Sequence, residues 1–181
     1  AQRSQSVYLL SMLGEAQHLS DVIKATQDPD LHVALSAFRG LMQQKDAPHL
    51  QHHLSKVLSH FKHLNPSFIS KIISEAGNAI APTLNQIFAD RTLDHEVRVF
   101  AGKSLRLLKE LSSVEIALKL VKDEEENPFV LAQALKILGQ FGQVIHISAV
   151  CPLIYASDSV VSISAIAALA NIGENRDVQK L

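Results

Sequence analysis

Apolar residues recur along this chain in a pattern that restarts about every 32 residues. An Asp or Asn stands just ahead of five apolar stretches with helical spacing, and these residue types favour the N-terminal cap of a helix. The five are Asp30, Asn65, Asp94, Asn127 and Asp158, at intervals of 35, 29, 33 and 31 residues. Each is therefore predicted to begin a helix.

The third, seventh and eleventh residues after each cap are apolar, and a spacing of four keeps them near one helix face. The seventh position is small in four of the five stretches, which suits a close approach of two helices. The fifteen positions are Val33, Ala37, Leu41, Phe68, Ile72, Ala76, Val97, Ala101, Leu105, Val130, Ala134, Leu138, Val161, Ala165 and Leu169. They are expected to form the core.

A second set of helices is predicted between the capped ones. Their expected ranges are Glu15–Gln27, Pro48–Leu64, Ile80–Ala89, Ser113–Lys122 and Ile145–Tyr155. The unit is then a helical hairpin of about 32 residues, repeated about five times. One hairpin cannot bury its apolar face alone, so neighbours are expected to stack into an α-solenoid, one domain spanning residues 1–181.

Composition supports an all-α fold. Hydrophobic residues make up 47% of the chain but aromatic residues only 5%, so the core must be aliphatic. Seven glycines and six prolines are too few for a protein of many strands and turns. The net charge of −1 argues against a general electrostatic grip on nucleic acid.

Cysteine content and hydropathy indicate a cytoplasmic setting. The single cysteine, Cys151, excludes a disulfide framework within the chain and lies in an apolar run typical of a buried thiol. No apolar run reaches the ~18 residues of a membrane span, and the chain does not start with a signal-peptide pattern.

The hairpins resemble HEAT repeats. The clearest stretches are "HLSDVIKATQDPDLHVALSAFRGL" at residues 18–41 and "DHEVRVFAGKSLRLL" from Asp94, which keeps the Val-Arg pair of the family as Val97 and Arg98. The resemblance implies a right-handed α-solenoid of the armadillo/HEAT kind. Because the other repeats lack this arginine, the Asp–Arg ladder of the family is expected to be mostly missing. The residues in its place are Ala34, Ile69, Leu131 and Ser162.

The two ends of the chain do not carry the polar face that caps a solenoid, so the sequence is expected to be a fragment of a longer protein. A membrane anchor elsewhere in that protein is compatible with this sequence.

Five histidines gather in residues 48–66, at His49, His52, His53, His60 and His63. On one helix they fall in a single stripe of about 100°, separate from the apolar face. His49 and His53 are the weak candidates for a metal, with Asp46 as a third ligand, whereas His60 lies about 10.5 Å beyond His53. We expect these histidines to form a solvent-exposed surface without a specific role. The alternatives are a metal site and a surface that binds a partner in a pH-dependent way.

The run "KDEEEN" at residues 122–127 precedes Pro128 and is expected to be a solvated turn, since negative charge near a helix N-terminus is favourable. It lacks the central glycine and alternating oxygen ligands of a calcium loop.

A partial basic stripe is predicted on the capped helices. Its members are Arg39, Lys71, Lys103, Arg106 and Lys136. In HEAT proteins the second helix of each hairpin lines the concave side, so the resemblance implies that an acidic peptide of another protein docks there. The aromatic residues typical of single-strand nucleic-acid binding are missing from this stripe.

These patterns favour a non-catalytic protein-binding scaffold or adaptor, with no catalytic residues and no cofactor. The alternative is a HEAT-repeat enzyme or enzyme subunit, with a metal on the His49/His53 side; a nucleic-acid-binding solenoid is third. Some HEAT-repeat enzymes hold a di-iron site through several His-Glu pairs, and this chain has one, His95-Glu96.

Overall fold

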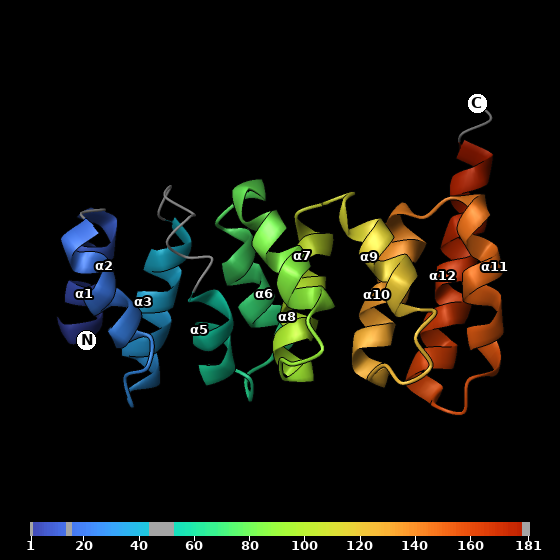
Figure 1. Cartoon of the computed structure of the whole chain (residues 1–181). Coiled ribbons are helices and arrows are strands. Elements are labelled where there is room, and N and C mark those ends of the chain that lie inside the picture. Colours follow the sequence, from blue (N-terminus) through green and yellow to red (C-terminus); the bar gives the residue numbers. More distant parts are fainter. Residues whose placement is uncertain (1, 14–15, 44–52, 179–181) are drawn as a thin grey trace.

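The computed structural model describes residues 2–13, 16–43 and 53–178, and all regular structure in these ranges is helical. Helix labels follow Figure 1. The five helices that follow a predicted cap are α3 (Leu31–Gln43), α6 (Pro66–Ser74), α8 (His95–Leu107), α10 (Pro128–Phe141) and α12 (Ser159–Val178). Each begins at the residue directly after its predicted cap, which confirms all five helix starts.

At four of the five helix starts, a side-chain oxygen of the cap residue accepts a hydrogen bond from the backbone of the helix. Asn65 and Asn127 each accept a hydrogen bond from the backbone N–H two residues on, at 2.8 and 2.9 Å. Asp30 and Asp158 do the same at 2.9 and 2.8 Å. Asp94 differs, because its carboxylate accepts from Lys62 Nζ at 2.9 Å and makes no cap hydrogen bond to α8.

The remaining helices precede the capped ones. They are α1 (Gln2–Leu13), α2 (Ala16–Ala25), α5 (Leu54–His60), α7 (Ala81–Ala89), α9 (Ser113–Leu120) and α11 (Ile147–Val150), with 3₁₀ turns at Asn78–Ile80, Val144–His146 and Cys151–Tyr155. The predictions for α7 and α9 are confirmed within two residues. The single helix expected at Ile145–Tyr155 is wrong: this segment is a 3₁₀ turn, one turn of α-helix and a second 3₁₀ turn. Pro152 lies at the start of that last turn, where it has no N–H to continue an α-helix.

The helices follow one another across the molecule in the order of the chain (Figure 1). The capped helices pack in succession, α6 on α8, α8 on α10 and α10 on α12, while α1 packs on α3. Preceding helices also pack on the capped ones, with α2 on α3, α7 on α8 and α9 on α10. Among the described residues, no helix combines the length and the apolar character that crossing a membrane requires.

The predicted core positions are largely confirmed. All five residues at the seventh position after the caps are buried. The third position is buried in four helices, but Phe68 of α6 is 48% exposed. The eleventh position is buried as Leu41, Leu105 and Leu138 and half-buried as Leu169. Ala76 is also half-buried and lies beyond the end of α6, which is only nine residues long. The second hairpin therefore departs most from the pattern.

One buried ion pair joins α8 to the turn ahead of α10. The Arg98 guanidinium donates to both carboxylate oxygens of Glu126, at 2.8 and 2.6 Å, and its Nε donates to the Phe88 carbonyl at 3.1 Å. The two side chains of the pair are only 4% and 2% exposed. The expectation that "KDEEEN" is a solvated turn is thus wrong for Glu126, because its carboxylate pairs with the buried Arg98.

Candidate functional site

Three of the five predicted basic residues lie together. Lys103 and Arg106 come from α8 and Lys136 comes from the neighbouring α10; we call these three the basic cluster. The spacing of three residues in α8 places Lys103 and Arg106 on one side of the helix. A cavity of about 450 Å³ adjoins the cluster, lined by Arg106 and Lys136, by Gly139 and Gln140 of α10, and by Ser164, Ala167, Ala168 and Asn171 of α12.

The cluster is held by neutral groups. Arg106 Nε donates to Gln140 Oε1 at 3.2 Å, and Lys103 Nζ donates to the Ser67 hydroxyl of α6. Among the ion pairs of the described residues, none involves a member of the cluster. Arg106 and Lys136 line the cavity, and the charge of Lys103 lies near both of them, with no ion pair to a carboxylate among the described residues.

Burial and mutual repulsion both disfavour the charged forms. Desolvation lowers the pKa of Lys103, and the nearby Arg106 charge lowers it further. Desolvation also lowers the pKa of Lys136, with added repulsion from Arg106 and Lys103. The pKa of Arg106 is lowered by burial. An anion in the cavity would relieve this repulsion, because an opposite charge nearby favours the protonated form of a lysine.

Because the folded chain disfavours the charged forms of Lys103 and Lys136, its free energy of unfolding is predicted to depend on pH. Folding lowers the pKa of Lys103 and Lys136, so between the lowered values and about 10.4 the unfolded chain holds more protons than the folded chain. The free energy of unfolding then rises with pH across that window. We expect a Lys103→Met/Lys136→Met variant to gain stability over the native chain at neutral pH, with the difference narrowing toward pH 10.5. Urea unfolding followed by circular dichroism at several pH values measures it; a difference that does not change with pH would contradict the repulsion.

Arg39 and Lys71 do not join the cluster. Arg39 forms a bidentate ion pair with Glu75, which follows the last residue of α6. Its Nη2 donates to Glu75 Oε1 at 2.8 Å and its Nε donates to Oε2 at 3.1 Å. The hydrogen bond to Glu75 raises the pKa of Arg39. Lys71 is exposed on α6 and does not line the cavity beside the cluster. The positions of the basic residues in the sequence do not show which of them form an ion pair with a carboxylate in the folded chain.

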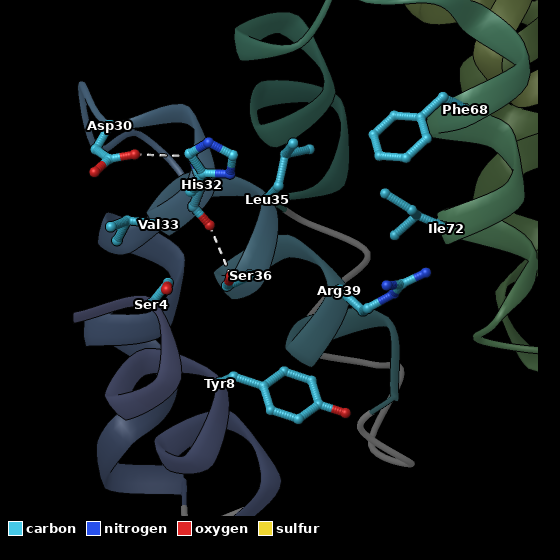
Figure 2. Close-up of a pocket in the computed structure, with 10 residues that line it drawn as sticks. All are labelled: Ser4, Tyr8, Asp30, His32, Val33, Leu35, Ser36, Arg39, Phe68 and Ile72. Carbon is cyan, nitrogen blue, oxygen red and sulfur yellow. Dashed lines mark hydrogen bonds between the residues drawn. The ribbon is translucent and has the colours of Figure 1, made fainter. Parts of the chain in front are cut away.

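A second hollow lies between α1, α3 and α6, with a volume of about 1020 Å³ (Figure 2). We call it the α3–α6 groove. Phe68 and Ile72 of α6 face Leu35 of α3 across it, with Arg39 at one side, and the hydroxyls of Ser4, Tyr8 and Ser36 lie along α1 and α3. Tyr8 donates to Gln43 Oε1 at 2.9 Å.

The sequence pattern missed this groove because Phe68 was placed in the core. A signal was present: the second hairpin alone has Ala76 at the eleventh position, where the others have leucine, and bulky Ile72 where the others have alanine. Those departures marked the hairpin whose capped helix is short and whose packing against α3 is open.

The structure describes three of the five histidines in residues 48–66, namely His53, His60 and His63. His49 and His52 lie outside the described residues, as does Asp46. The expected helix from Pro48 is described only from Leu54, and His53, His60 and His63 are exposed. Within residues 2–13, 16–43 and 53–178, no three His, Cys, Asp or Glu side chains are grouped to hold a metal ion.

Comparison with known proteins adds no assignment: neither the scan of protein-family models nor the search of curated proteins found a match to this chain.

Proposed function

We propose that the chain is a right-handed α-solenoid of HEAT-like hairpins that acts as a non-catalytic protein-binding module. Its basic cluster, together with the adjoining cavity, holds an acidic segment of another protein. The observation that carries this proposal is the grouping of Lys103, Arg106 and Lys136 beside a cavity, with no carboxylate pairing them among the described residues.

The hairpin part of the proposal is supported by the five capped helix starts and by the succession of contacts from α6 to α12. Because each hairpin buries its apolar face against the next, side chains on successive capped helices come together into one extended surface. Lys103 and Lys136 occupy the ninth position after their caps, so the repeat itself aligns them.

The chemistry of the cluster fits an acidic peptide. Complementary charge accelerates encounter and orients the partner, and a surface that is already formed limits the ordering cost of binding. Arg106 offers a planar fork that suits a carboxylate, and the lysines supply point charges beside it. The hydroxyl of Ser164 and the amides of Gln140 and Asn171 provide neutral groups along the same cavity.

Charge reversal tests the proposal. A fluorescein-labelled peptide of alternating Glu and Ser is titrated with the native chain and with Lys103→Glu/Lys136→Glu, and its anisotropy is followed. We expect the variant to bind about tenfold more weakly or worse, because two negative charges at the binding surface repel the acidic peptide. Raising the salt from 50 to 200 mM should weaken binding of the native chain, since the Debye length shortens.

A matched variant separates the site from overall charge. Lys119→Glu/Lys122→Glu makes the same change in net charge on two exposed lysines in and just after α9. It should bind the peptide within about twofold of the native chain, because exposed charges away from the contact are screened. Equal losses in both variants would show that only net charge matters. Tighter binding of a single-stranded DNA oligonucleotide than of the peptide would replace a protein partner by a nucleic acid.

A further inference from the structure

The two lysines of the basic cluster stand at a repeat position that has an acidic partner in the first hairpin. There the ninth residue after the cap is Arg39, and it pairs with Glu75, the tenth residue after the next cap. The tenth residue after each of the two later caps is Ile137 or Ala168, and both are buried. The packing of one hairpin on the next therefore brings no carboxylate to either lysine from this position.

Every polar side chain among the described residues that line the cavity can donate a hydrogen bond, and none is a carboxylate. Arg106 uses its Nε to bond Gln140 Oε1, so its two terminal nitrogens and the Gln140 amide nitrogen remain for a ligand. Asn171 Nδ2 lies 3.5 Å from the place that a Cβ of Gly139 would occupy, so this amide nitrogen faces the gap that the glycine leaves. The cavity is thus built to receive hydrogen-bond acceptors.

The charge of the cluster exceeds what one carboxylate offsets. A carboxylate carries one negative charge on two oxygens, whereas a phosphoserine carries about −1.5 to −2 at pH 7 on three strong acceptor oxygens. The cluster holds three cations, and burial together with their repulsion lowers the pKa of both lysines. Two carboxylates brought to the same place would repel each other, since a like charge nearby disfavours ionisation. One phosphate supplies the same charge on a single group.

We propose that the acidic segment bound by the basic cluster is phosphorylated, and that one phosphoserine or phosphothreonine phosphate binds between Arg106 and Lys136. The Arg106 fork donates to two phosphate oxygens, as guanidinium groups do with phosphate, and the lysine ammonium groups bond the remaining oxygen. Gln140 and Asn171 donate to backbone carbonyls of the segment beside the phosphate. Because it names the bound group of the acidic segment, this inference rests on the proposed function.

Three fluorescein-labelled peptides test the phosphate on the whole chain. They share the sequence of alternating Glu and Ser and differ only at one central residue, which is serine, glutamate or phosphoserine. We expect the phosphoserine peptide to bind about tenfold more tightly than the glutamate peptide at pH 7.5, because its hydrogen bonds are more numerous and are all charge-assisted. Fluorescence anisotropy gives the dissociation constants. Equal values for these two peptides overturn the phosphate and leave the proposed carboxylate-binding module standing.

Neutralising the two lysines shows where the phosphate binds. Lys103→Met/Lys136→Met leaves one cation in the cluster, so the preference for phosphoserine over glutamate should fall to about twofold or less. The matched control, Lys119→Met/Lys122→Met, removes two exposed lysines in and just after α9 and should keep the tenfold preference. A preference that persists in Lys103→Met/Lys136→Met overturns the proposal, because the phosphate then binds elsewhere.

Inorganic phosphate distinguishes a phosphorylated segment from a free phosphate ion. We expect it to displace the phosphoserine peptide only at concentrations at least about a hundredfold above the dissociation constant of the peptide, because the ion lacks the backbone contacts. Displacement at concentrations near that constant would assign the cavity to free phosphate and overturn the phosphorylated segment. If neither the glutamate nor the phosphoserine peptide binds in a way that depends on the cluster, the proposed function fails as well.

Discussion

Glu126→Ala is expected to lower the free energy of unfolding by about 3–5 kcal/mol, the usual cost of leaving one member of a buried ion pair without its partner. The substitution leaves the positive charge of Arg98 without its carboxylate partner, although the Arg98 side chain is only 4% exposed. The Phe88 carbonyl is then the remaining acceptor for the guanidinium among the described residues. It also removes the acceptor of the Asn127 backbone N–H, 2.8 Å from Glu126 Oε1, at the cap of α10. Urea unfolding followed by far-ultraviolet circular dichroism measures the loss.

Two controls separate the stranded charge from the general effect of losing a carboxylate. Asp123→Ala removes the nearer of two carboxylates that pair with Arg91, in a half-exposed pair of 2.9 Å, and should cost about 1 kcal/mol or less. Arg98→Met/Glu126→Leu replaces the buried pair by apolar side chains and should recover most of the loss, since a well-packed apolar replacement is often neutral. If Glu126→Ala costs no more than Asp123→Ala, the pair does not hold the two hairpins together.

Gly139→Gln is expected to lower the free energy of unfolding by about 1–3 kcal/mol, the cost of forcing extra atoms into a packed contact. A Cβ at this position of α10 would lie 2.9 Å from the Cα and 3.3 Å from the Cβ of Ala168 in α12. The nearer atom is backbone, so relief requires the two helices to separate. Because Gln favours a helix by up to about 1 kcal/mol over Gly, any loss must come from the contact.

The matched control is Gly173→Gln in the exposed part of α12. A Cβ there meets no atom within 4 Å, so only the helix preference acts and stability should rise by up to about 1 kcal/mol. The two variants carry the same substitution with opposite expected signs. A gain at both positions would mean that α10 and α12 are less closely packed than the distance between Gly139 and Ala168 indicates.

The helix starts were predictable because their signals are local. A cap acts on the backbone two residues away, so Asp30, Asn65, Asn127 and Asp158 could be identified from their own neighbourhoods. The seventh-position residues were predictable for a similar reason, since a spacing of four fixes a helix face. The short segments from residue 144 to 155 were not, because an apolar run does not distinguish a succession of short 3₁₀ and α-helical turns from one continuous helix.

The candidate site was predictable only in part, because it depends on contacts across a whole hairpin. Arg39 and Lys103 stand at the same position after their caps, yet Arg39 meets Glu75, 36 residues on, while Lys103 meets a serine hydroxyl. Glu126 belongs to an acidic run whose other members are more exposed, and its burial depends on an arginine 28 residues earlier. No local pattern contains these partners.

The ion pairs between hairpins carry a consequence for the order in which the chain gains and loses structure. Each joins residues 28 to 36 positions apart, so every such contact closes over about one repeat. Contacts confined to neighbouring hairpins favour folding that begins in one hairpin and spreads to the next. Amide hydrogen exchange should then be graded along the chain, slowest where Arg98 and Glu126 lock α8 to α10 and faster at the α3–α6 junction.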